Sequence, residues 1–389
     1  MTLSFSRATF FLLLPLLFVH WAGDAASAAY VLCLFLGALI FRLSIDKVSK
    51  EAVILSTILL FHLFLVFVLN HPTVNDLLDF SASSYLKLYY QAVSLFLVVI
   101  LISLLPPMTI VHAKRLLYFF YVVFLMSIVV EWFLVNIFGI SNTLMPAYRD
   151  SYSYYLAFQG FYRPFGLVGN APINGCMLVF ATWVMIVYVR PSRANYFLLL
   201  TLIALLLNNS GQALLAFFIT TAMYFSLRAR SVIRFLVLLA SLCMIVAIIY
   251  FNVFSKLSLD YVLYLMEFLT VSIIHEMDVT RIFFGGFAYY KDIFLTTEVY
   301  FIYAVERFGL IVTILTWIYI WFRLPTAKKT LFFSALFLGD IHYAMILHIP
   351  LLVLFALVVK YCGNMQPSAV YKREHRRNAI VSQHPQLQV

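Results

Sequence analysis

Apolar segments long enough to cross a lipid bilayer recur along this chain and constrain its fold more than any other feature. A membrane-spanning helix needs about 20 mostly apolar residues, because lipid offers no hydrogen-bond partners to unpaired backbone groups. Twelve candidate runs cover residues 8–22, 25–41, 52–69, 85–105, 116–140, 173–189, 195–207, 213–227, 235–254, 299–322, 331–338 and 345–361. They predict an all-α polytopic membrane protein of about 12 transmembrane helices (11–13), in one integral membrane domain over residues 1–389.

Composition excludes a water-soluble protein. Apolar residues make up 64% of the chain and charged residues 11%, whereas soluble domains carry about 25% charged residues. The four cysteines lie inside apolar runs without metal-ligand spacing, so they are interpreted as small buried residues.

The positions of the basic residues predict the orientation of the chain. The net charge of +10 would suggest nucleic acid in a soluble protein, but Lys and Arg of membrane proteins collect in cytoplasmic loops. Nineteen of the 26 basic residues fall on alternate loops if both termini are cytoplasmic, and a basic tail covers residues 363–389. No nucleic-acid partner is expected. Residues 6–29 also resemble a signal peptide; an uncleaved first helix is expected, and cleavage would not change the later orientation.

Two long segments lie on the predicted outer side. Because the sequence has no nucleotide motif and no long cytoplasmic loop, the function is expected in the membrane or on this outer face. The first, residues 141–172, is rich in tyrosines that either form an interfacial belt or stack on a ligand. It contains Arg163 beside Pro164, followed by Asn170 and Asn174 where the next helix begins. An arginine beside a helix N-terminus suits a phosphate-bearing ligand.

The second outer segment, residues 255–298, is predicted to begin with an amphipathic helix at the membrane interface. Asp278 and Arg281 follow, and Glu298 opens the next transmembrane helix. Glu306 and Arg307, further along that helix, are interpreted as partners of other helices.

Polar residues also interrupt two helix pairs. Asn208–Gln212 follows an apolar run of about 13 residues, too short to cross the bilayer, so these residues are expected to face a cavity or other protein. The alternative is an ordinary turn in a thinned bilayer.

Asp340, His342 and His348 interrupt the last helix pair, where a carboxylate can orient an imidazole. Glu131, inside residues 116–140, is interpreted as a bundle partner. Arg163, Arg281, Glu298, Asp278, Asp340 and His342 together suit an anionic lipid-linked substrate.

Several motifs resemble the bacterial O-antigen polymerase and O-antigen ligase family. RPFGLVGNAPING resembles the family's Arg-x-x-Gly and Asn pattern, and NNSGQALLAFF its following helical break. TRIFFGGFAYY followed by TTEVYFIYAVERFGLIV resembles its second periplasmic loop, and HYAMILHIP the histidine of its last helix pair. Two departures are Ser210-Gly211, where the family has a Ser-Arg type sequence, and Thr297-Glu298, where ligases have His-Asn. The second departure favours a polymerase.

The resemblance implies a GT-C-like bundle in the bacterial inner membrane and a metal-independent glycosyltransferase without cofactors. A polymerase transfers a glycan from an undecaprenyl-diphosphate-linked donor to the non-reducing end of a second lipid-linked repeat unit at the periplasmic face. Expected partners are this donor and acceptor, the lipid bilayer, a chain-length regulator and a flippase.

Residue roles follow as hypotheses. Arg163 and Arg281 would bind the diphosphate, and Glu298, with His342 as second choice, would be the general base. Weaker substrate contacts are expected from Asn170, Asn174, Gln212, Asp278, Tyr300 and Asp340, and no metal site is expected. The alternatives are an O-antigen ligase acting on lipid A core, a lipid-linked oligosaccharide flippase or anionic solute transporter, and a structural subunit.

Overall fold

The computed structural model describes residues 57, 109–140, 163–227, 263, 279–284, 300–326, 328–341 and 348–362, with the backbone alone for 279–281, 300–303 and 306–308. Within these ranges all regular elements are helices and no strand occurs, which confirms the predicted helical class for this part of the chain. The longer helices are α6 (Ile110–Asn136), α8 (Ala171–Val184), α9 (Ala194–Asn208), α10 (Gly211–Ser226), α14 (Tyr300–Arg323), α15 (Lys329–Asp340) and α16 (Ile349–Leu357).

Three helical stretches are long and apolar enough to cross a membrane: Ile110–Asn136, Ala171–Val189 and Pro191–Asn208. Shorter apolar helices cover Gly211–Ser226, Gly309–Arg323 and Ile349–Cys362. These lengths and compositions are those of a membrane protein. Four predicted runs lie outside the described residues: 8–22, 25–41, 85–105 and 235–254. The structure describes only residue 57 of the run 52–69, and the predicted amphipathic helix is described only at residue 263.

The first residues of α6 and α16 differ from the predicted ones. α6 begins at Ile110 instead of 116, because the Thr109 side chain caps it by accepting a hydrogen bond from the His112 backbone N–H (3.4 Å), so Lys114 and Arg115 belong to the helix. α16 begins at Ile349 instead of 345, with Pro350 in its first turn. Both α8 and α16 end in π-helical turns, η5 (Met185–Val189) and η11 (Val358–Cys362).

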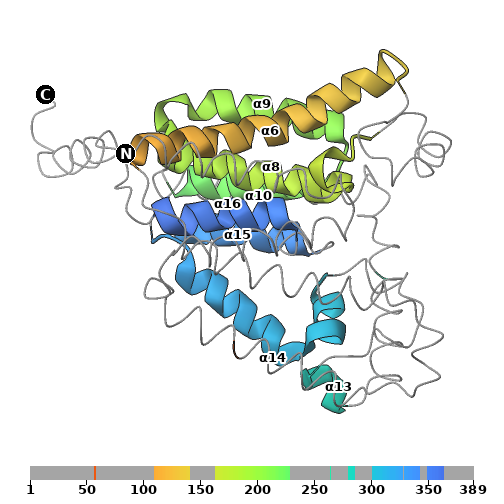
Figure 1. The fold of residues 1–389 in the computed structure, drawn as a ribbon, viewed down its shortest axis with the longest axis vertical. Helices are drawn as coiled ribbons and strands as arrows, with labels where there is room; N and C mark the ends of the chain where they lie inside the picture. Colours follow the sequence, from red (N-terminus) through yellow and green to blue (C-terminus); the bar gives the residue numbers. More distant parts are fainter. Residues whose placement is uncertain are drawn as a thin grey trace, which may run out of the picture.

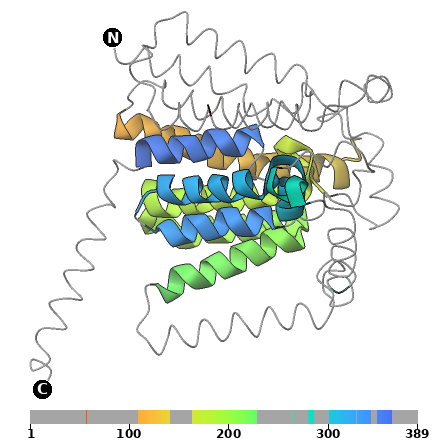
Figure 2. The ribbon, with the colours of Figure 1, turned by 90° about the horizontal axis from the view of Figure 1, so that it is seen from below.

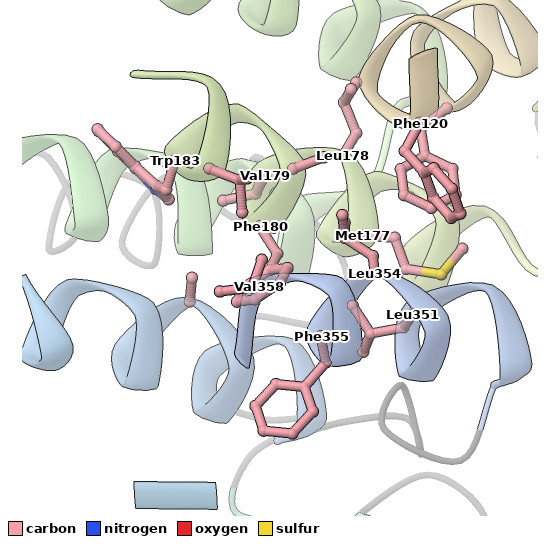
Figure 3. Packing of buried hydrophobic residues seen from close by; sticks show 14 of the residues in the cluster. Phe120, Met177, Leu178, Val179, Phe180, Trp183, Leu351, Leu354, Phe355 and Val358 are labelled. Carbon is pink, nitrogen blue, oxygen red and sulfur yellow. The ribbon is translucent and has the colours of Figure 1, made fainter. Parts of the chain in front are cut away.

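α8 is the central helix of the described part. In the most apolar 18 residues of each stretch, 89% of the residues are buried in Ala171–Val189, which contains α8. The same fraction is 33% in α6 and 39% in Pro191–Asn208, which contains α9. Figure 1 shows α6, α9, α10, α15 and α16 running nearly parallel around α8. Side chains of α6, α8 and α16 meet in one apolar layer (Figure 3). A helix that is apolar on all sides is expected in such a position.

A chain of hydroxyl groups joins the apolar helices near their middle. Tyr121 of α6, Thr201 of α9 and Thr182 of α8 are linked by hydrogen bonds of 3.3 and 2.7 Å. Thr182 Oγ1 donates to the Leu178 carbonyl (2.7 Å), so Thr201 must donate to Thr182 and Tyr121 to Thr201. On the other side of α8, Trp183 Nε1 donates to Thr220 Oγ1 of α10 (2.8 Å). Interhelical hydrogen bonds of this kind fix helix register in lipid.

α14 lies beside α15 and is broken at Gly309. Trp317 of α14 packs edge-on against Phe333 of α15, with ring centroids 5.5 Å apart. Figure 2 shows the ribbons of the two helices next to each other. Gly309 has φ 80° and ψ 160°, so the chain bends there before continuing as a helix. The short helix α13 (Val279–Phe284) packs against this bend: a Cβ on Gly309 would lie 2.3 Å from the Phe283 carbonyl oxygen. Only glycine fits both the φ angle and this close approach.

Candidate functional site

Polar side chains of the described residues gather where α6 approaches its end, α8 begins, α9 turns into α10 and α15 ends. We call this set the polar cluster. Its members come from segments that are distant in sequence but joined by hydrogen bonds, and they are Ser127, Glu131, Arg163, Asn170, Asn174, Asn208, Ser210, Gln212 and Asp340.

The segment before α8 is built around two glycines in the left-handed region. Gly166 has φ 65° and Gly169 has φ 69°, and a single 3₁₀ turn, η4 (Gly166–Val168), connects them. Asn170 then caps α8: its Oδ1 accepts a hydrogen bond from the Ile173 backbone N–H (3.2 Å). Arg163 therefore precedes a compact turn that leads directly into the central helix.

Buried side chains fix this segment from two neighbouring elements. Glu131 of α6 is 2% exposed, and its Oε2 accepts a hydrogen bond from the Gly166 backbone N–H (2.7 Å). Asn174 is fully buried; its Oδ1 accepts from the Leu167 backbone N–H (3.3 Å), and its Nδ2 donates to Ser127 Oγ (3.1 Å). Glu131 is thus a bundle partner, as its sequence context indicates.

The polar turn between α9 and α10 faces protein, one of the two predicted surroundings. Asn208 and Ser210 are buried, and Asn209 adopts φ 48° between the two helices. Asn208 Nδ2 donates to the Pro164 carbonyl (3.4 Å), and Gln212 Nε2 donates to the carbonyls of Leu338 (3.2 Å) and Gly339 (2.7 Å). The helix before this turn is longer than the predicted run of about 13 residues: α9 has 15 residues, and 18 with the preceding 3₁₀ turn.

Asp340 and Arg163 lie in segments that are both bonded to the turn between α9 and α10. Asp340 is the last residue of α15, which packs against α8, and it is 2% exposed. Arg163 is half-buried, with its Nε inside the protein, and it is followed immediately by Pro164, which Asn208 holds. The cluster therefore combines a cation and a carboxylate at one end of the central helix.

The structure brings together five of the predicted site residues: Arg163, Asn170, Asn174, Gln212 and Asp340. Arg281 lies in α13 and Tyr300 begins α14, and these helices pack together at Gly309; the two side chains are outside the described part. Asp278, Glu298 and His342 also lie outside the described residues. In the parts that are described, no group of three or more His, Cys, Asp or Glu could hold a metal ion.

Three residues that were predicted to contact the substrate make hydrogen bonds within the protein. Asn170 caps a helix, Asn174 is fully enclosed and bonded at both ends of its amide, and the Gln212 amide nitrogen is occupied by α15. In this structure all three hold the backbone around the site. The sequence reasoning also missed Ser127 and the role of Gly309. A lone glycine inside a helical run is a signal for a break or a close approach.

Comparison of the chain with known protein families, with curated proteins and with solved structures gives no match.

Proposed function

We propose that this protein is a glycan polymerase of the bacterial inner membrane, with about twelve transmembrane helices in a GT-C-like bundle and both termini in the cytoplasm. It would transfer a glycan from an undecaprenyl-diphosphate-linked donor to the non-reducing end of another lipid-linked repeat unit at the periplasmic face. The proposal rests on the sequence resemblance and on the residues around Arg163.

The observation that supports it best is the way in which the backbone next to Arg163 is held. Pro164 and Gly166 are bonded to Asn208 and Glu131, at 3.4 and 2.7 Å, so the arginine extends from a segment fixed on two sides. An arginine on a fixed backbone segment forms bidentate, charge-assisted contacts with phosphate and needs little backbone reorganisation during reaction. A lipid diphosphate leaving group requires stabilisation of this kind.

In the proposed reaction, an acceptor sugar hydroxyl attacks the anomeric carbon of the donor. The hydroxyl proton passes to Glu298, or to His342 oriented by Asp340, while the bond to the diphosphate breaks and its electron pair leaves with the diphosphate. Arg163 and Arg281 would neutralise the developing charge, so the chemistry does not require a metal ion. Tyrosines of residues 141–172 would stack on sugar rings.

The cellular test compares long-chain polysaccharide in a strain lacking the protein and complemented with variants at equal protein level. Arg163→Ala and Arg281→Ala should each abolish long chains. Glu298→Gln should abolish them while lipid-linked substrate still binds. Unchanged chains in both arginine variants would refute the assignment, and unchanged chains in Glu298→Gln would move the general base to His342.

A ligase would instead require lipid A core as acceptor, and a flippase would move the lipid-linked unit without lengthening it. Glu298, where ligases of the resembling family have an Asn after His, is the feature that favours polymerisation.

A further inference from the structure

The turn between α9 and α10 is bonded to two segments that carry candidate site residues. On its first side Asn208 ends α9, and its Nδ2 donates to the Pro164 carbonyl. On its second side Gln212, in the first turn of α10, donates to α15. Ser210 between them caps α10 by accepting a hydrogen bond from the Ala213 backbone N–H (3.3 Å), which stiffens the turn.

The first bond restrains the segment that carries Arg163. Asn208 is fully buried and packs closely on α8: its Oδ1 lies 2.8 Å from where a Cβ on Gly175 would be. The amide group therefore has little freedom, and its nitrogen fixes the carbonyl of Pro164, the residue next to Arg163. Movement of the α9–α10 turn would move this anchor.

The second bond restrains the end of α15. The last four carbonyls of an α-helix lack partners within the helix. Gln212 Nε2 satisfies two of these, on Leu338 at 3.2 Å and Gly339 at 2.7 Å, directly before Asp340. An amide that bonds two adjacent carbonyls fixes both the position and the rotation of the final turn.

We propose that Asn208 and Gln212 are positioning residues that set the placement of Arg163 relative to Asp340. Because the same short turn is bonded to both segments, it fixes the spacing between the cation and the carboxylate. The positional claim stands on the contacts alone, whereas its catalytic consequence rests on the proposed function. Gln212 then acts through the end of α15 and does not contact the substrate.

Amide hydrogen exchange of the purified full-length protein tests the positional claim without any substrate. Gln212→Met keeps the side-chain length and removes the donor, so exchange in peptides covering 335–341 should rise about fivefold or more while 163–170 stays protected. Asn208→Leu should give the converse pattern. Thr220→Val is the matched control, because it removes an interhelical hydrogen bond of the same α10 and should change neither region.

Unchanged exchange at 335–341 in Gln212→Met would overturn the proposal. If Gln212→Met raises exchange throughout the protein, exchange at 335–341 in Gln212→Glu decides instead. The ionised carboxylate keeps the size and polarity of the side chain but presents no donor to the two carbonyls.

Chain elongation tests the catalytic consequence. Gln212→Met should lower kcat on the order of 100-fold with little change in KM, and adding it to Asp340→Asn should lower kcat no further. Additive losses of kcat in that double variant would show that Gln212 does not act through Asp340. If wild-type protein elongates no chains, the proposed function fails, and the exchange result still decides whether the turn holds both segments.

Discussion

The backbone N–H of Gly166 donates a 2.7 Å hydrogen bond to Oε2 of Glu131, which lies 35 residues earlier in the chain and is 2% exposed. This bond connects the segment that carries Arg163 to α6. A buried carboxylate inside an apolar helix is costly unless it is bonded. Glu131 therefore anchors the turn before α8.

Replacement of Glu131 should reveal this anchoring role. Glu131→Leu removes the acceptor for Gly166 N–H and should lower the stability of the protein in detergent by about 2–3 kcal/mol. Glu131→Gln keeps an acceptor of the same length and should cost less. Chemical or thermal denaturation followed by tryptophan fluorescence measures both. Equal losses in the two variants would show that charge, and not the bond to Gly166, is what matters.

Gly166→Ala should be strongly destabilising for two separable reasons. Its φ of 65° strains an L-residue by about 1–2 kcal/mol, and a Cβ would lie 2.0 Å from Asn174 Nδ2, which adds an overpacking cost of about 1–3 kcal/mol. Gly139→Ala is the matched control, since Gly139 has φ 64° but open space around it. The difference in unfolding free energy between the two variants measures the contact with Asn174.

Asn174→Ala removes the atoms that a Cβ on residue 166 would meet. Combined with Gly166→Ala, it should therefore cost clearly less than the sum of the single changes. Simple additivity would contradict the packing described around Gly166.

Gly309→Ala should displace α13, which carries Arg281. The new Cβ would lie 2.3 Å from the Phe283 carbonyl oxygen and 2.7 Å from the Phe284 carbonyl carbon, and backbone atoms cannot rotate away as a side chain can. We expect chain elongation to fall at least tenfold, because the proposed diphosphate contact moves. Normal elongation in this variant would separate α13 from the site.

Thr201→Val should weaken the packing of α6, α8 and α9 without affecting the polar cluster. It removes the hydroxyl that links Tyr121 and Thr182, and bonds of this kind contribute about 0.6 kcal/mol on average in membrane bundles. Thr316→Val, which removes only a bond within α14, is the control and should cost less. Denaturation curves of the two variants give the comparison.

Long apolar runs were predictable because lipid enforces them. The runs at 173–189, 195–207, 213–227 and 299–322 correspond to helices with ends displaced by two residues or fewer, since polar or capping residues mark where they stop. The start of α6 was missed by six residues, because the Thr109 cap lies beyond two basic residues that interrupt the apolar run. The bend at Gly309 was missed because it depends on the approach of α13.

Sequence reasoning found the polar residues around Arg163 but not what they contact. Asn174 and Gln212 look like ligand-binding amides in a loop-rich region. Yet Asn174 bonds the Leu167 backbone N–H, 7 residues away, and the Ser127 hydroxyl, and Gln212 bonds backbone carbonyls more than 120 residues away. Such pairings depend on tertiary packing, which residue types and spacing do not specify.

The most direct test of the proposed function supplies purified full-length protein with one synthetic lipid-linked repeat unit and separates the products by size. Wild-type protein should give a ladder of lengthened chains. Arg163→Ala should lower its rate by about 100-fold or more, while Thr316→Val should leave it intact. The absence of a ladder with wild-type protein, or an unchanged ladder with Arg163→Ala, would contradict the account.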